Sequence, residues 1–278
     1  WADKLHPDYP SSGYLLLVGE TEILPADTLT IDAPFYDRVR VWPSDMLYGD
    51  TRGHSWKTEL RVGRIAGDNT SDIANAMNTS SLVAAGEPDY DYGQEKAVIY
   101  SGDDEGKNMF RACAADLTEQ ARIFFDTVER GRVDNNDLTD EFIADAPDSD
   151  YIVYRGHGWE SGWSDVIETP LLNAAVIGDG KPVVAGWACS TANYEDPVDD
   201  YSLAEDFLNN GAGAYIGSVV VSPRGENNIG ARKFQNSLVA LRRDVGRSLL
   251  DAKREFKTDY SLCDTCNYDN RRWVSEYH

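Results

Sequence analysis

Two apolar runs of the chain end in side chains that can do covalent chemistry. They read YIVYRGHG at residues 151–158 and VVAGWACS at residues 183–190. Buried parallel strands read as continuous apolar runs of this kind, and the carboxyl ends of such strands lie at one edge of the sheet, where open α/β folds place their reacting groups. We therefore expect His157 and Cys189 to lie side by side as a cysteine nucleophile and its histidine partner.

The rest of the pattern alternates strands with helices. This alternation predicts an α/β fold in which a mostly parallel sheet is covered on both faces. The segment 25–58 is rich in Asp and Pro and has little periodicity, so we expect a long excursion there, and we expect the last helix to break near Gly246. We predict strands at 14–18, 59–65, 96–101 and 214–221, and helices at 70–85, 108–130, 137–144, 202–210 and 229–257.

The cysteine and histidine also have a purely structural interpretation. A cysteine that ends a strand is most often a small core residue. Packing alone, however, does not explain the glycines on both sides of His157, and Gly158 lets the backbone N–H point at a developing oxyanion. His54 also follows a glycine, but its polar surroundings favour an exposed loop. The sequence holds no HExxH, GxSxG, Walker or GxGxxG pattern.

At these residues the chain resembles the gingipain-type cysteine peptidases of the caspase–gingipain clan. The hallmark of that family is an apolar strand ending in His-Gly, followed by a second apolar strand ending in Ala-Cys. Three further segments match in the family's order, namely residues 14–19, 43–50 and 60–65. The resemblance covers residues 14–257 and concerns the family's catalytic subdomain. It implies a caspase-like three-layer α/β/α sandwich and a cysteine endopeptidase that forms an acyl-enzyme and requires no cofactor.

The roles of the site residues follow from this chemistry. Cys189 would attack the carbonyl carbon as a thiolate, and His157 would protonate the leaving amine and later help to activate water. The N–H groups of Gly158 and Cys189 would stabilise the oxyanion. The resemblance adds an orienting carboxylate that falls by position on Asp103, where it would favour the protonated imidazole; an acidic turn residue explains Asp103 equally well.

Specificity is where the chain departs from the family's pattern. Well-known members take Arg or Lys before the scissile bond and have a small hydroxyl residue two positions before the histidine, where this chain has Arg155. Side chains alternate along a strand, so Arg155 shares a face with His157 and Trp187 shares one with Cys189. We expect Arg155 and Trp187 to line the substrate pocket and to favour acidic or neutral residues. Asp196 or Glu195 could neutralise the guanidinium, which leaves the preference open.

Length and composition indicate one domain over residues 1–278. The chain has no linker or repeat, 41% of its residues are apolar, and no apolar stretch approaches the ~20 residues that span a bilayer. The net charge of -22 disfavours nucleic acid and anionic membranes as partners. We expect a secreted or cell-surface protein that acts on proteins or peptides. Trp1 does not look like a native start, so the domain could be trimmed at both ends and belong to a protein with additional domains.

Metal sites have only weak support in the sequence. Calcium as a structural ion could use the acidic runs at 103–105 and 195–200, but EF-hand spacing is absent and solvated loops explain these runs as well. Cys263 and Cys266 form a CxxC turn with no second pair to complete a zinc site, so we expect a structural role for them. Cys113 is expected in the core.

Two other functions fit the same fold. One is a catalytically silent binding or scaffold domain, since fold does not fix function. The other is a transpeptidase that passes its acyl group to an amine. The presence of both His157 and Cys189 favours a peptidase over a silent domain, whereas the sequence does not separate hydrolysis from transpeptidation.

Overall fold

The structure is a computed structural model that describes most of the chain between residues 13 and 261. The described residues are 13–31, 40–50, 58–67, 69–84, 95–132, 138–169, 177, 180–194 and 202–261. His54, the acidic run 195–200 and the cysteines at 263 and 266 lie outside them, so the expectations for those residues stay predictions.

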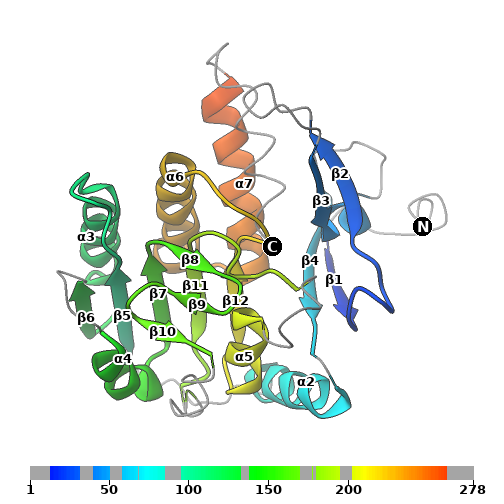
Figure 1. The fold of residues 1–278 in the computed structure, drawn as a ribbon, viewed down its shortest axis with the longest axis horizontal. Helices are drawn as coiled ribbons and strands as arrows, with labels where there is room; N and C mark the ends of the chain where they lie inside the picture. The colour runs from blue at the N-terminus through cyan, green and yellow to red at the C-terminus, as the bar shows by residue number, and fades with distance from the viewer. Residues whose placement is uncertain are drawn as a thin grey trace.

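A five-stranded parallel sheet forms the centre of the fold (Figure 1). Its order is β12-β11-β7-β5-β6, and neighbouring strands all pair in parallel. All five residues of β7 are buried, which explains why this strand reads as a continuous apolar run. The strands are β5 Lys96–Ser101, β6 Thr127–Arg132, β7 Tyr151–Arg155, β11 Val183–Trp187 and β12 Ala214–Gly217.

Both faces of this sheet are covered, as the sequence predicts. One face packs against α3, α6 and α7, and the other packs against α4, α5 and a small antiparallel sheet of β8, β9 and β10 (Figure 1). The three-layer α/β/α architecture is therefore confirmed. The helices are α3 Met109–Ala121, α4 Thr139–Asp145, α5 Leu203–Asn209, α6 Arg224–Gln235 and α7 Val245–Ser261, and the short strands are β8 Gly158–Trp159, β9 Gly162–Trp163 and β10 Ile167–Glu168.

The N-terminal part forms a separate, smaller layer beside α7. Here β1 and β4 pair in parallel as a two-stranded sheet, and β2 and β3 form an antiparallel pair. A buried ion pair between Arg64 and Asp45, 2.6 Å long, holds β4 against the adjoining 3₁₀ helix η1. The elements are β1 Gly13–Val18, β2 Asp27–Ile31, β3 Arg40–Ser44, η1 Asp45–Gly49, β4 Leu60–Ile65 and α2 Thr70–Ala84.

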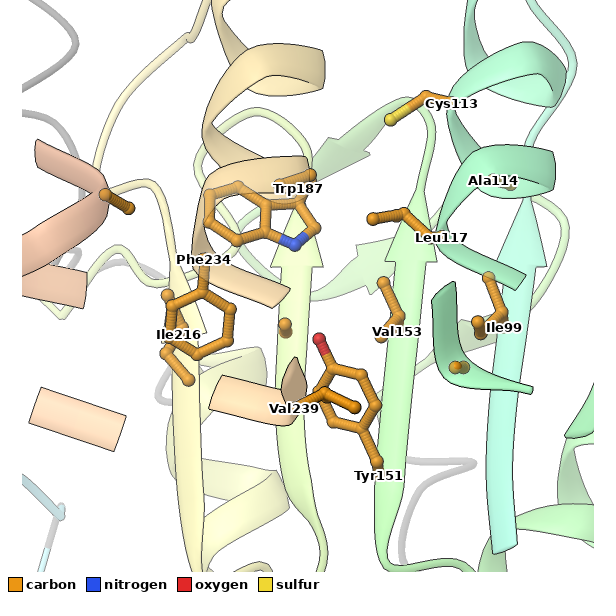
Figure 2. Packing of buried hydrophobic residues seen from close by; sticks show 14 of the residues in the cluster. Ile99, Cys113, Ala114, Leu117, Tyr151, Val153, Trp187, Ile216, Phe234 and Val239 are labelled. Atoms are coloured by element: carbon orange, nitrogen blue, oxygen red, sulfur yellow. The ribbon is translucent and has the colours of Figure 1, made fainter. Parts of the chain in front are cut away.

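The main core lies between the central sheet and the layer of α3, α6 and α7. Figure 2 shows Trp187 of β11 among these side chains, above Phe234 of α6 and beside Leu117 of α3. The rings of Trp187 and Phe234 have centroids 5.7 Å apart. Cys113 belongs to this cluster and is fully buried, so its predicted core position is confirmed.

Two predicted elements differ from the structure, and the predicted break of the last helix near Gly246 is confirmed. The predicted helix 108–130 ends at Ala121, and residues 127–132 form the edge strand β6, because the β-branched Thr127 and Val128 suit a pleated surface. The segment 25–58, which we expected to have little periodicity, contains the strands β2 and β3. The short sequences of these strands show no clear alternation of apolar and polar residues. The last helix breaks at residues 241–244, just before Gly246, after a π-helical turn over Asn236–Ala240.

Within the described part of the chain, no helix combines the length and the apolar character needed to cross a membrane.

The buried carboxylate of Asp104 generates a stability prediction. Burial alone would raise the pKa of Asp104, but hydrogen bonds from the backbone N–H groups of Asn108, Phe110 and Met109 at the start of α3 lower it below its usual range. A lowered folded-state pKa means that the stabilisation is present above the ordinary pKa of about 3.9 and is lost as the pH falls through the folded value. Asp104→Ala should therefore cost about 1–2 kcal/mol of unfolding free energy near neutral pH, and less below about pH 4.

Urea unfolding of wild type and variant between about pH 3 and 7 measures this difference. Asp103→Ala is the matched control, because the neighbouring carboxylate is exposed and its ion pair with Arg111 is long, at 3.9 Å. Equal losses for the two variants would contradict a capping role for Asp104.

Candidate active site

The ends of β7 and β11 bring His157 and Cys189 to the same edge of the sheet. The two strands are adjacent and parallel, and Arg155 pairs with Trp187 in their register. His157 lies two residues after Arg155, and Cys189 lies two residues after Trp187. Since neighbouring strands lie roughly 4.8 Å apart, the sequence-predicted pair comes together at one site. Both side chains are partly exposed.

Gly158 is the point at which the loops after the two strands touch. A Cβ atom on Gly158 would lie 2.6 Å from Cγ2 of Thr191 and 2.9 Å from Cβ of Ala188. These two residues flank Cys189, so only a residue without a side chain allows the histidine loop to approach the cysteine loop this closely.

The hydrogen bonds of the small sheet orient the N–H of Gly158. The N–H of Ser164 donates to the carbonyl of His157 over 3.0 Å, so these two residues form a hydrogen-bonded pair of the antiparallel hairpin. Gly158 and Trp163 form the next pair, which is of the non-hydrogen-bonded kind. The N–H of Gly158 therefore points away from β9 and is available for another acceptor.

Cys189 lies on a tight turn that follows β11. Its Sγ is 3.6 Å from the carbonyl oxygen of Ser222, and the next residue, Ser190, has a positive φ of 56°. Such a conformation is unfavourable for a residue with a Cβ, and it tends to occur at functional sites. The N–H of Ser190 donates to the carbonyl of Val220 over 3.0 Å, which fixes the turn. Among the described residues, no hydrogen bond engages the N–H of Cys189.

The imidazole of His157 contacts a cation and an aromatic ring. Nη2 of Arg224 lies 3.0 Å from Nε2 of His157, and the ring of Phe110 meets the imidazole edge-on with centroids 5.1 Å apart. Burial and the charge of Arg224 lower the pKa of His157, and the opposing effects of Glu105 and Asp103 are smaller. The resting imidazole is therefore biased toward the neutral form, unlike the imidazolium that the sequence led us to expect.

The acidic run after β5 serves three different purposes. Asp104 is buried and caps α3, as described above. Glu105 lies 3.8 Å from Arg224 and from Lys107. Asp103, the expected orienting carboxylate, is about half exposed and faces Arg111. No hydrogen bond joins Asp103 to His157 in the described part of the chain, and its charge acts on the pKa of His157 less than that of Glu105.

Arg155 and Trp187 lie deeper than expected. Both are 1% exposed, and the ring of Trp187 belongs to the core beside Phe234. Alternation does put Arg155 on the same face as His157, where both contact Phe110, but its guanidinium is buried rather than exposed at the wall of a pocket. The placement as pocket residues is therefore wrong, because α3 and α6 cover this face of the strand ends.

The guanidinium of Arg155 instead connects three segments of the site. It donates to the carbonyls of Gly156, Trp187 and Arg224 at 3.2, 2.7 and 2.7 Å, and to Oδ1 of Asn228 at 2.5 Å. It also lies over the ring of Phe110, 4.2 Å from the centroid.

Several residues of the site were missed by the sequence analysis. The hydroxyl of Tyr154 donates to the carbonyl of His157 over 2.7 Å, and burial keeps the pKa of this phenol raised, so the donor stays protonated. Phe110 comes from α3, Ser222 from the loop before α6, and Arg224 and Asn228 from α6. Nothing in their local sequence marks them, although the SPRG turn at residues 222–225 does lie at the carboxyl end of a predicted strand.

No group of three or more His, Cys, Asp or Glu side chains within the described ranges could hold a metal ion. The acidic run at 195–200, suggested for calcium, lies outside these ranges.

Comparisons with solved structures show the same fold. The crystal structure of the Arg-specific cysteine proteinase gingipain R matches with a TM-score of 0.78 at 14% identity, over 99% of this chain and 64% of that chain. The complex of the Porphyromonas gingivalis RgpB pro- and mature domains matches with a TM-score of 0.75 at 14% identity, over 99% and 65% of the two chains. A structure described as a protease matches with a TM-score of 0.77 at 16% identity, over 95% and 62%.

The chain thus spans 64% of the length of the gingipain R chain that it matches. A comparison with curated proteins gave no significant match. The sequence model of peptidase family C25 matches residues 4–276, which is nearly the whole chain and includes both strand ends of the site. The chain belongs to peptidase family C25, the gingipain family.

Proposed function

We propose that this chain is a cysteine endopeptidase in which Cys189 is the nucleophile and His157 the proton-transfer partner. The observation that supports this most strongly is the register of β7 and β11, which puts two accessible reactive side chains at the ends of adjacent parallel strands. Membership of a cysteine peptidase family and the fold shared with gingipain R agree with it.

The reaction would proceed in two halves. In the first half, the thiol of Cys189 gives its proton to the neutral imidazole, and the sulfur attacks the carbonyl carbon of the scissile bond. The imidazolium then protonates the leaving amine, the C–N bond breaks, and a thioester remains. In the second half, His157 takes a proton from water, the resulting hydroxide attacks the thioester, and the carboxylic acid leaves as the thiol is restored.

The oxyanion of both tetrahedral intermediates would be stabilised by the N–H groups of Gly158 and Cys189. The N–H of Gly158 points away from its hairpin, and the N–H of Cys189 has no acceptor among the described residues. Preorganised donors of this kind contribute several kcal/mol to transition-state stabilisation, about 3–4 for one donor.

The lowered pKa of His157 determines the acid side of the pH profile. The neutral imidazole must accept the thiol proton, so activity requires a pH above the pKa of His157. Because burial and Arg224 lower this pKa from its ordinary value of about 6.5, the enzyme should stay active to a more acidic pH than a peptidase with an unperturbed histidine. Asp103 and Glu105 moderate this effect, which is the role we assign to the carboxylates after β5.

The test is a peptide-library digest in which the cleavage sites are identified by mass spectrometry. Cleavage by wild type supports the endopeptidase, transfer of the acyl group to an added amine supports a transpeptidase, and no reaction with any peptide supports a binding domain. A secreted or cell-surface location remains a prediction, which detection of the protein in the culture medium or surface fraction would support.

The reactivity of the two described thiols can be predicted. Iodoacetamide near neutral pH should alkylate Cys189 selectively over Cys113, because Cys189 is accessible whereas burial raises the pKa of Cys113 and blocks access to it. Cys189→Ala should lower kcat/KM at least about a thousandfold. Cys113→Ala, checked for folding, serves as the control and should keep its activity. Undiminished cleavage by Cys189→Ala would refute the mechanism.

A further prediction concerns Gly158. Gly158→Ala should lower kcat/KM about a hundredfold, because the added Cβ would displace Ala188 and Thr191 on either side of Cys189. Gly63→Ala is the matched control, since its nearest neighbour would be 4.0 Å away. Steady-state kinetics and thermal unfolding of both variants separate misalignment from loss of folding. If a folded Gly158→Ala variant were as active as wild type, the close contact of the two loops would have no part in catalysis.

A further inference from the structure

The loop between β12 and α6 forms one wall of the proposed site. It comprises residues Ser218 to Pro223 and leads into α6, whose first residue is Arg224. Ser222 contacts the cysteine turn twice, through its carbonyl at Sγ of Cys189 and through its hydroxyl, which lies 3.3 Å from the carbonyl of Ala188. A peptide bound at Cys189 would therefore lie close to the side chain of Arg224.

The guanidinium of Arg224 is incompletely satisfied at this position. Its Nη2 faces Nε2 of His157 at 3.0 Å, and since a guanidinium can only donate, Nε2 must accept and the neutral imidazole carries its proton on Nδ1. Its Nη1 is covered and has no hydrogen-bond partner among the described residues. The side chain as a whole remains 29% exposed, so a ligand can reach it.

The carboxylate nearest to Arg224 holds it only loosely. Glu105 lies 3.8 Å away and is 69% exposed, and ion pairs of this length and exposure contribute little. The two other arginines of this region differ in another way. Arg155 is buried among four acceptors, and Arg111, whose ion pair with Asp103 is also long at 3.9 Å, acts less than Arg224 on the pKa of His157. Arg224 is thus the cation beside the reacting groups that a substrate can engage.

We propose that Arg224 is a specificity-determining residue that binds a carboxylate side chain of the peptide, on a residue flanking the scissile bond. A guanidinium donates charge-assisted hydrogen bonds to a carboxylate, and it repels the side chains of Arg and Lys. Arg224 thus takes the recognition role that the sequence suggested for Arg155. The inference rests on the proposed peptidase function and names its substrate class.

Binding of such a carboxylate also changes the surroundings of His157. The charged groups facing the imidazole are Arg224, Glu105, Arg155 and Asp103, in order of their influence, and Phe110 covers its edge. A substrate carboxylate neutralises the charge of Arg224 and draws its guanidinium away from Nε2 of His157. The imidazole then accepts the proton of the Cys189 thiol more readily, so acidic substrates gain in kcat as well as in KM.

The experiment compares isosteric peptide pairs that carry Asp or Asn, and Glu or Gln, at the positions before and after the cut. Wild type should prefer the acidic member about ten- to hundredfold in kcat/KM at one of these positions, as expected for a charge-assisted hydrogen bond. Arg224→Gln should reduce this preference to about threefold or less, and Arg224→Glu should invert it toward Lys.

The matched control is Arg232→Gln, which removes the same charge from the same helix. Arg232 is 35% exposed and pairs with Asp116 at 2.6 Å, so the preference should be unchanged. The rate of Cys189 alkylation near pH 8 shows that each variant retains a folded site.

Equal cleavage of the Asp and Asn peptides by wild type would overturn the role of Arg224 and leave the peptidase intact. Full acid preference in a folded Arg224→Gln variant would do the same. If wild type cleaved no peptide at all, the proposed function would fail, and this inference would fail with it.

Discussion

The buried guanidinium of Arg155 holds together the segments from which the site is made. Its four hydrogen bonds reach the ends of β7 and β11 and the start of α6, and its planar face rests on Phe110. A buried charge is costly unless hydrogen bonds replace its hydration, and here carbonyl oxygens and an amide do so. The same contacts fix the positions of Gly156 and Trp187, so the alignment of His157 with Cys189 depends on this one side chain.

A second constraint is the absence of side chains where the loops meet. Gly156 leaves room for the hydroxyl of Tyr154, which would lie 2.0 Å from a Cβ at that position. From there, the phenol donates to the carbonyl of His157, while its ring stacks on Trp163 with centroids 4.9 Å apart. The two faces of β7 thus act together, since Arg155 anchors the histidine loop from one side and Tyr154 from the other.

The electrostatics of the site disfavour a protonated His157 in the resting state. Two permanent cations, Arg155 and Arg224, lie near His157 and lower its pKa, and only exposed carboxylates oppose them. The shared fold with gingipain R at 14% identity shows that the layered sheet tolerates extensive change in its side chains. Charges around the strand ends can therefore differ between relatives while the architecture stays the same.

The sequence by itself determined the parallel sheet and the position of His157 and Cys189 at one edge of it, because buried parallel strands leave continuous apolar runs and their ends meet at one edge. It also identified Gly158, because packing alone does not explain the glycines on both sides of His157. It could not resolve residues 122–132, where an apolar spacing of three or four residues fits both a helix and a turn followed by an edge strand. Only the tertiary structure decided that Arg155 is buried and that Arg224 reaches His157. Those positions depend on how α3 and α6 pack across the strand ends, and contacts between residues 67 or 69 apart leave no local pattern in the sequence.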